Sequence, residues 1–359
     1  MLNSHLLGNL RWFLLAICAD ALWLPGHAGA QNTARPGDAV TIEYIAHACF
    51  RVISPAGKQL LIDPFASRVW IGYDFPPDLH ADAVLISHPH YDHDGGEAMG
   101  RKVPWPPNTP VLRNAGTNHL GDITIVGYAG KHADPWGKEF GQSNTVWLVE
   151  VAGLRIVHLG DNGPLNNATI EQIGRVDVLM APIDSQFHIL KSDEIAVIRR
   201  RLSPSVLIPM HYRHDDLELF REKPEQLGGI ESWAKAEGNV RYLTAHKETF
   251  SFSSLPKQPE VLIFKHSPLV KRSPAIKENE NPALRAGGAL DLIGPAVAFR
   301  RAHRRWPKDY TELSPLVEQP GGQARARQYD RVALTELPDG SLEISSVTRG
   351  QTNRITIPK

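Results

Sequence analysis

Short runs of hydrophobic residues, separated by turn residues, follow one another from about residue 40 to residue 265. Runs of this length that alternate with polar residues, or are apolar throughout, are typical of β-strands. Turn residues such as Ser54-Pro55-Ala56-Gly57 separate the first runs, which predicts an antiparallel meander. The expected strands span residues 40–45, 49–53, 59–62, 83–86, 123–128, 145–151, 154–158, 176–180 and 206–210.

Apolar positions three or four residues apart appear between the later strands, and this spacing is typical of helices. The expected helices span residues 168–173, 193–202 and 228–236, and Ser192 is expected to be the N-cap of the second. Strands followed by strand–helix alternation predict sheets covered by helices in a layered α/β domain over residues 36–265. The sequence contains no internal repeat.

The composition changes at Lys265, where residues rich in Pro, Lys, Ser, Glu and Asn begin. This change predicts a linker over residues 266–283. Residues 284–359 are expected to form a small α+β unit, with a helix over Leu290–His303 and a hairpin around Pro338-Asp339-Gly340. We interpret the arginines at 300–305 as a solvated helix face rather than an anion site.

Residues 1–30 are expected to be a secretory signal peptide. Arg11 precedes the apolar run from Trp12 to Leu24, and Ala28-Gly29-Ala30 supplies small residues for cleavage after Ala30. The run is short for a membrane span, and Asp20 interrupts it. We therefore expect a periplasmic or secreted protein with no stable membrane span, and a lipid anchor on Cys18 stays open.

The charge balance narrows the choice of partners. Lys and Arg together number 39, as do Asp and Glu, so neither nucleic acid nor an anionic membrane surface is an expected partner. A small-molecule substrate is expected instead, and the oligomeric state is left open. After removal of a signal peptide Cys49 would be the one remaining cysteine, which excludes an intramolecular disulfide.

Candidate chemistry concentrates directly after the strand expected at 83–86. The segment from Ser87 to Gly96 has the sequence Ser-His-Pro-His-Tyr-Asp-His-Asp-Gly-Gly. Imidazole nitrogens and carboxylate oxygens suit zinc and related divalent metals. In an extended segment His88 and His90 point to the same side, so both can reach one ion. One loop cannot complete two sites, and further ligands must come from later segments.

This motif, its place after a strand and several landmarks downstream resemble the metallo-β-lactamase superfamily over roughly residues 40–265. The resemblance implies a four-layer αβ/βα sandwich, with the metal site at the edge shared by the two sheets. It also implies two divalent ions, zinc above all, with manganese or iron as alternatives. The implied ligands are His88, His90 and His132 on one ion, Asp92, His93 and His211 on the other, and Asp161 bridging both.

Each distal residue has a rival or a second explanation. His132 competes with His119 and His158, and is preferred for its spacing to Gly160-Asp161. His158 lies inside an expected strand and is interpreted as a core residue or a neighbour of the site. Asp161 follows an apolar strand, where a buried carboxylate needs a cation. Residues that stay candidates for substrate contact or for supporting the site are His47, His158, Asp184, His188 and His214.

Within the superfamily, the segment Ile42–Phe50 together with Leu61-Ile62-Asp63-Pro64 resembles the lactonase-like and phospholipase-D-like subgroup. One departure is Ala46-His47, where that subgroup usually has Gly-His. The implied reaction is cleavage of an ester, lactone or phosphodiester by metal-activated water, with Asp92 and Asp161 as catalytic residues. Asp92 would orient the nucleophile and assist proton transfer. The alternatives are a β-lactam hydrolase, a catalytically silent metal-binding protein and, less favoured, a di-iron flavoprotein.

Overall fold

The computed structural model describes residues 38–67, 71–77, 79–90, 92–95, 105–106, 108–133, 136–139, 141–183, 189–214, 227–272, 292, 296, 299–300, 302–317, 331–348 and 351–357. Several predictions lie outside these ranges. They are the signal peptide with Cys18, the pocket candidates Asp184 and His188, and most of the linker.

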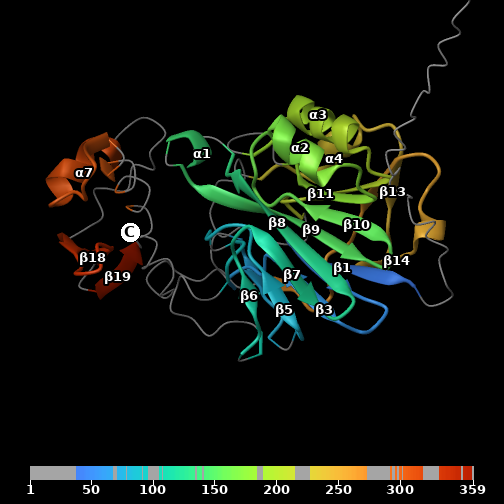
Figure 1. Ribbon diagram of the computed structural model, residues 1–359, viewed down its shortest axis with the longest axis horizontal. Helices are drawn as coiled ribbons and strands as arrows, with labels where there is room; N and C mark the ends of the chain where they lie inside the picture. The colour runs from blue at the N-terminus through green and yellow to red at the C-terminus, as the bar shows by residue number, and fades with distance from the viewer. Residues whose placement is uncertain are drawn as a thin grey trace, which may run out of the picture. The chain divides into compact units, whose positions relative to one another are not determined.

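The first sheet is built mainly from the N-terminal part of the domain (Figure 1). Its six strands have the order β14-β1-β2-β3-β5-β6. Strands β1 to β3 form the antiparallel meander that the sequence predicts, whereas β3, β5 and β6 pair in parallel. The bounds are β1 Val40–Ala46, β2 Cys49–Ile53, β3 Gln59–Ile62, β5 Ala83–Leu85, β6 Val111–Leu112 and β14 Lys247–Phe250.

The second sheet has eight strands in the order β13-β15-β12-β11-β10-β9-β8-β7. Strands β7 to β10 pair antiparallel, and β10, β11, β12, β15 and β13 run parallel. The bounds are β7 Gly116–Leu120, β8 Ile123–Lys131, β9 Ser143–Val151, β10 Leu154–His158, β11 Val178–Pro182, β12 Val206–Met210, β13 Val240–Tyr242 and β15 Glu260–Ile263.

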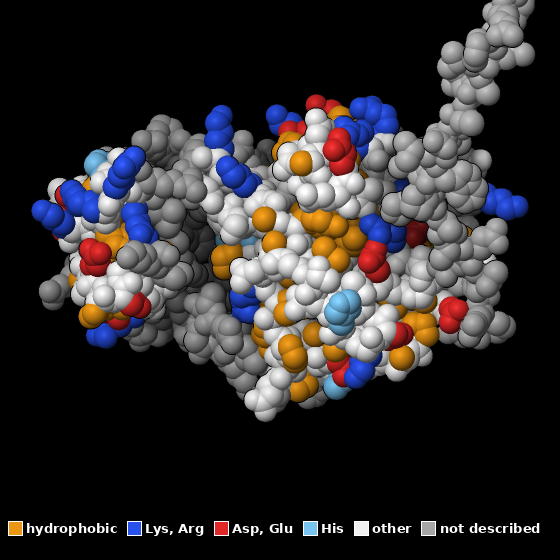
Figure 2. Space-filling model, viewed as in Figure 1, with side chains coloured by type: hydrophobic (Ala, Val, Ile, Leu, Met, Phe, Trp, Pro, Cys, Tyr) orange, Lys and Arg blue, Asp and Glu red, His pale blue; other side chains and the backbone are white. Residues whose placement is uncertain are grey.

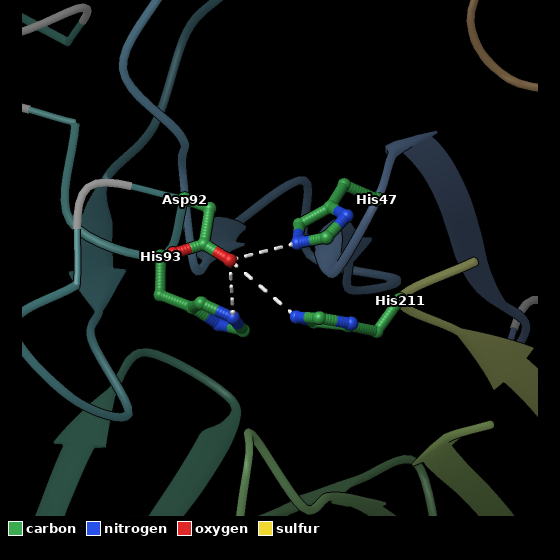
Figure 3. A group of neighbouring side chains, drawn as sticks. All are labelled: His47, Asp92, His93 and His211. Atoms are coloured by element: carbon green, nitrogen blue, oxygen red, sulfur yellow. Dashed lines mark hydrogen bonds and ion pairs between the residues drawn. The ribbon is translucent and has the colours of Figure 1, made fainter. Parts of the chain in front are cut away.

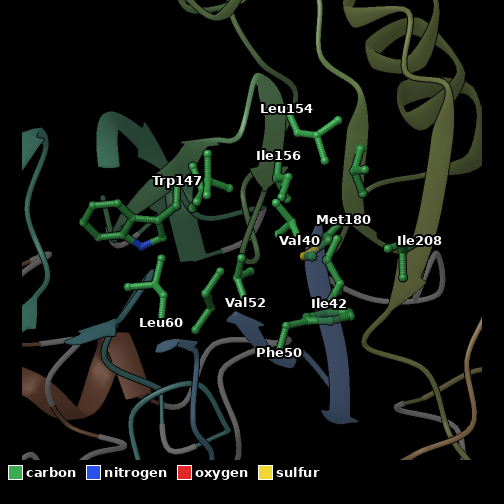
Figure 4. Close-up of a cluster of buried hydrophobic side chains, with 14 of the residues drawn as sticks. Val40, Ile42, Phe50, Val52, Leu60, Trp147, Leu154, Ile156, Met180 and Ile208 are labelled. Atoms are coloured by element: carbon green, nitrogen blue, oxygen red, sulfur yellow. The ribbon is translucent and has the colours of Figure 1, made fainter. Parts of the chain in front are cut away.

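The hydrophobic core lies between the two sheets (Figure 4). Alternate residues of each central strand enter this core, and the residues between them are buried on the outer faces. On β9, for example, Trp147 and Val149 face the first sheet, while Val146 and Leu148 face the helices. Burial on both faces explains why these strands are apolar throughout rather than alternating.

Helices cover the outer face of the eight-stranded sheet, where α2 Asn167–Ile173, α3 Ser192–Leu202 and α4 Ile230–Ala234 pack (Figure 1). Two shorter elements are α1 Trp136–Glu139 and a 3-10 turn at Phe252–Ser254. The N-cap predicted at Ser192 is wrong by one residue. Lys191 is the N-cap, because it precedes the helix with an extended backbone; its main-chain N–H donates a hydrogen bond to the Glu194 carboxylate at 2.8 Å.

The outer face of the six-stranded sheet is covered by buried side chains that include Phe65, Tyr73, Phe75 and Trp105. Tyr73 belongs to the short strand β4 Tyr73–Asp74. This strand pairs antiparallel with β16 Lys271–Arg272. Residues 271–272 belong to the predicted linker, so the start of that segment pairs with the domain. Two mixed sheets with helices on one outer face confirm the predicted α/β fold class.

The C-terminal part has a core of its own, in which Leu292, Phe299, Trp306 and Leu342 are buried together. It contains α7 Tyr310–Val317 and an antiparallel sheet of β17 Arg331–Glu336, β18 Leu342–Thr348 and β19 Gln351–Ile357. The predicted hairpin is confirmed, and Asp339 stabilises its turn by accepting a hydrogen bond from Ser341 N at 2.9 Å. Strand β19 was not predicted.

Acidic and basic side chains are interspersed over the described part of the face seen in Figure 2, as the balanced composition predicts. Within the described ranges, no helix combines the length and apolar character that a membrane crossing needs.

Candidate metal centre

The predicted ligands meet where several strands end. His47, His132 and His211 are each the first residue after a strand, namely β1, β8 and β12. The histidine loop follows β5, and Asp161 follows β10. Segments up to 164 residues apart in sequence (211 − 47) therefore supply one buried group of side chains.

Four side chains form a first cluster, whose ligand atoms lie within 4.8 Å of one another: His88, His90, His132 and Asp161. Nε2 of His88 lies 3.0 Å from Nδ1 of His90. Oδ2 of Asp161 lies 3.7 Å from His88 Nε2 and 3.5 Å from His132 Nε2. The structure thus brings together the three histidines that the resemblance assigns to one ion.

A second cluster consists of His47, Asp92, His93 and His211 (Figure 3). One oxygen of Asp92, Oδ2, faces the Nε2 atoms of His47 at 3.0 Å, His211 at 3.4 Å and His93 at 3.5 Å. Three of these residues are the predicted ligands of the other ion. His47 was expected to be structural or near the site, and the structure makes it a full member of the cluster.

Asp161 lies between the two clusters. Its Oδ2, which faces the first cluster, is also 3.3 Å from His211 Nε2, and its Oδ1 is 3.3 Å from His93 Nε2. The main chain of Asp161 is fixed, because Asn144 Oδ1 accepts a hydrogen bond from Asp161 N at 3.1 Å. One carboxylate therefore faces imidazoles of both clusters.

Three histidines have acceptors for the ring nitrogen that faces away from the clusters. His93 Nδ1 donates to Asp63 Oδ2 at 2.7 Å, and His132 Nδ1 donates to the Ala133 carbonyl at 2.8 Å. His88 Nδ1 lies 3.0 Å from Ser87 Oγ, which itself donates to Asp63. Such acceptors fix the tautomer and leave the lone pair of the other nitrogen directed inward, as metal-binding histidines require.

Asp63 is a supporting residue that sequence reasoning missed. Its two oxygens accept hydrogen bonds from Ser87 N at 2.7 Å, Ser87 Oγ at 2.6 Å and His93 Nδ1 at 2.7 Å, and the side chain is fully buried. The sequence contains a signal for this role, because Asp63, like Asp161, follows an apolar strand. Asp63 also lies in the Leu61–Pro64 motif, which carries the resemblance to the subgroup.

Burial and neighbouring charges favour the neutral form of some site residues and the charged form of others. Burial, together with neighbouring histidines, holds the pKa of His88 well below its usual value and lowers the pKa of His90 to about 3. Burial also disfavours the charged form of His211, but the Asp161 and Asp92 carboxylates outweigh it and raise the pKa of His211 to about 10. Burial alone would raise the pKa of both carboxyls, yet the adjacent imidazoles hold both pKa values well below the usual range.

The donor set fits divalent cations. Buried Nε2 of His93 and Oδ1 of Asp161 have no hydrogen-bond partner of ordinary geometry among the described residues, although they face each other. Leaving buried polar atoms unsatisfied is costly. Imidazole nitrogens and ionised carboxylates around such atoms are the ligands that zinc, manganese and iron prefer.

Other candidates have different places. His158 donates from Nε2 to the Ala48 carbonyl at 2.9 Å and accepts from Gly160 N at Nδ1, 3.1 Å away, so both nitrogens are used outside the clusters. His214 Nε2 lies 2.9 Å from the Tyr44 hydroxyl, outside both clusters. Asp184 and His188 lie outside the described residues.

Two cluster residues have left-handed backbones, His47 with a φ of 58° and His211 with a φ of 61°. Non-glycine residues adopt this conformation at an energetic cost, and they do so more often at functional sites. The two are joined directly, because His211 N donates to the His47 carbonyl at 3.0 Å. The Tyr44 hydroxyl donates to the same carbonyl at 3.1 Å, which fixes His47 further.

Replacing Gly160 by alanine is expected to damage the centre. Its φ is +55°, and an added Cβ would lie 2.5 Å from Asn144 Oδ1 and 2.6 Å from Ser87 Oγ. We expect about 1–2 kcal/mol from backbone strain and about 1–3 kcal/mol from crowding, with lower metal content. Gly57→Ala is the control, because Gly57 also has a positive φ but nothing within 4 Å. Equal destabilisation of both variants in urea unfolding would contradict the crowding argument.

Comparison with known proteins agrees with this geometry. The model of the β-lactamase superfamily domain matches residues 41–211, the segment from β1 to the last predicted ligand. A metal-dependent hydrolase of Thermococcus onnurineus is 27% identical over 192 residues, which cover 48% of this chain and 84% of the relative. Another, from Myxococcus xanthus, is 27% identical over 259 residues and covers 62% and 92% of the two chains.

Among solved structures, a protein of Thermotoga maritima assigned as a zinc-dependent hydrolase of the metallo-β-lactamase superfamily is 24% identical. The match has a TM-score of 0.48 and covers 64% of this chain and all of the other. The predicted superfamily is confirmed by the domain match and the relatives, while the lactonase-like subgroup stays a prediction. Residues 41–211 of this enzyme therefore form a β-lactamase superfamily domain, and the relatives of the chain are metal-dependent hydrolases.

Proposed function

We propose that this metal-dependent hydrolase binds two divalent ions and uses a metal-activated water to cleave an ester, lactone or phosphodiester bond. The position of Asp161 carries the proposal, since its two oxygens face imidazoles of both clusters at 3.3–3.7 Å. A single ion would need only one of these clusters. In the proposal, zinc is the first choice of metal, with manganese and iron as alternatives.

Each cluster would hold one ion. The first ion would be held by His88, His90 and His132, and the second by Asp92, His93 and His211, with Asp161 available to both. We place His47 beside the second group as a supporting residue, because its Nε2 lies 3.0 Å from Asp92 Oδ2. Two bound divalent ions supply Lewis acidity and lower the pKa of water to near neutrality.

The carboxylates of the chain would orient and deprotonate that water. The pKa of Asp92, which the adjacent His93 lowers against the effect of burial, keeps its carboxylate ionised at neutral pH. An ionised carboxylate accepts a hydrogen bond from the attacking water and can receive its proton. His47 holds Asp92 in place by donating from Nε2. Burial of these residues limits competing contact with bulk solvent.

We further propose that the enzyme acts outside the cytoplasm. The support is the N-terminal sequence, in which an apolar run is followed by Ala28-Gly29-Ala30. N-terminal sequencing of the protein recovered from its native host should begin at Gln31. A chain that retains Met1 would overturn this part of the proposal and leave the reaction untouched.

A panel of substrates tests the reaction. Zinc- and manganese-loaded protein is assayed against lactones, carboxylic esters, phosphodiesters and β-lactams. We expect turnover of one of the first three classes, and that turnover should disappear with a chelator and return with metal. β-Lactams as the best substrates would favour the β-lactam hydrolase instead.

The same panel also tests the catalytically silent alternative. A protein that binds two metal equivalents and turns over no member of the panel would favour a metal-binding role. Metal content is measured by elemental analysis on the folded, reconstituted protein. A folded protein without metal would contradict the central claim.

A further inference from the structure

We propose that Gln142 is a positioning residue of the metal centre, whose carboxamide oxygen accepts a hydrogen bond from His90 Nε2 when an ion is bound. The two side chains lie 2.9 Å apart. The inference rests on the proposed function, since it assigns a role within the first cluster. It deepens that function by naming a residue outside both clusters that sets the affinity for one ion.

A histidine that binds a metal through one nitrogen carries its proton on the other. A fixed acceptor for that proton holds the ring in place and makes it a better ligand. The rings of His88, His93 and His132 each have such an acceptor. The outward nitrogen of His90 faces the Gln142 carboxamide. The Gln142 side chain therefore lies where the other three rings have their acceptors.

The neighbours of His90 decide which of its nitrogens faces the ion. Nδ1 of His90 lies 3.0 Å from Nε2 of His88, and that nitrogen in turn faces Asp161 Oδ2 at 3.7 Å. Nδ1 of His90 is therefore on the inner side of the cluster. Nε2 points the other way, toward Gln142. An ion held by this cluster is bound by Nδ1, and the proton of His90 is then on Nε2.

The proton on His90 Nε2 determines which atom of the Gln142 amide must face it. The atom now nearest His90 is Nε2 of Gln142, which is a donor. Two donors cannot share a hydrogen bond, so a protonated His90 Nε2 needs the oxygen of the amide instead. Half a turn of the carboxamide brings Oε1 to the same place. Gln142 is half-buried, so its side chain is not fully enclosed by neighbours.

The main chain of Gln142 supports the same cluster without any change. Its carbonyl accepts a hydrogen bond from His132 N at 3.0 Å. One residue thus holds two of the three histidines of the first cluster, His90 through its side chain and His132 through its main chain. A substitution of the side chain removes the first contact and leaves the second.

The test compares metal binding by the full chain and by two variants, Gln142→Leu and Gln142→Glu. Chelator-treated protein is titrated with Zn²⁺, and the absorption spectrum of the Co²⁺ form is recorded. Leucine has similar size but no acceptor, so affinity for one of the two ions should fall by roughly 10- to 100-fold. Glutamate supplies acceptor oxygens and should keep that affinity. Gln172→Leu, at an exposed position of α2, is the matched control and should bind like the unchanged chain.

The outcomes separate this inference from the function on which it rests. Two-site binding that is unchanged in Gln142→Leu, in affinity and in Co²⁺ spectrum, would overturn the role of Gln142. An equal loss in the leucine and glutamate variants would also overturn it, because the acceptor would then not be the cause. Failure of the unchanged chain to bind Zn²⁺ would instead overturn the proposed function.

Discussion

Asp161→Asn is expected to abolish most of the activity while the protein stays folded. The substitution keeps the shape of the side chain and removes the charge that faces His88, His93, His132 and His211. We expect the rate to fall by roughly 10²–10³-fold at least, the cost of losing one preorganised electrostatic contact. Loss of an ion would add to this. Steady-state kinetics and metal analysis on the same preparation measure both effects.

A matched control exists on the same sheet. Asp177 is also buried, and its Oδ2 accepts a hydrogen bond from Arg155 N at 2.9 Å, near the start of β10 rather than its end. Asp177→Asn should lower the stability by about 1 kcal/mol and leave the metal content and the rate unchanged. If Asp161→Asn kept full activity with two ions bound, Asp161 would not bridge them.

Removal of metal is expected to lower the melting temperature by several degrees. An ion that binds only the folded state stabilises it by about 2.7 kcal/mol when its free concentration is 100 times its Kd. For a domain of this size this corresponds to roughly 5–11 °C per ion. The direction follows because the ion stabilises only the folded state, so its removal lowers the free energy of unfolding.

Differential scanning calorimetry with and without a chelator measures this shift. The Asp161→Asn variant serves as the comparison, because it should show a smaller shift or none. A melting temperature that does not respond to the chelator, in protein shown by elemental analysis to have lost its metal, would mean that the two clusters are stable without ions.

The sequence predicted most of the central strands because burial on both faces leaves a clear apolar run. The expected bounds of residues 49–53, 59–62, 154–158 and 206–210 match those of β2, β3, β10 and β12. Edge strands such as β7, whose residues are mostly exposed or half-buried, have no such pattern and were missed. The same holds for the two-residue ladder of β4 and β16, which is set by tertiary contact.

The predicted ligands were accessible to sequence reasoning because four of them lie in one dense motif and the other three follow strands. The residues that support these ligands were harder to predict from the sequence. Gln142 reaches His90 across 52 positions in sequence, from a loop whose residues carry no periodic signal. His47 was placed near the site but not in a cluster, because nothing in Ala46-His47-Ala48 specifies the left-handed turn that directs its ring.

The bond between His211 N and the His47 carbonyl has a consequence for the order in which the enzyme matures. A chain that emerges from synthesis contains the histidine loop long before residue 211, yet it cannot complete either the second cluster or the backbone turn that depends on this bond. A shortened or half-made product would hold a metal weakly and without the geometry for hydrolysis. Part of the binding energy is therefore gained only when His211 reaches His47, so ion uptake at the second cluster is coupled to this step of folding.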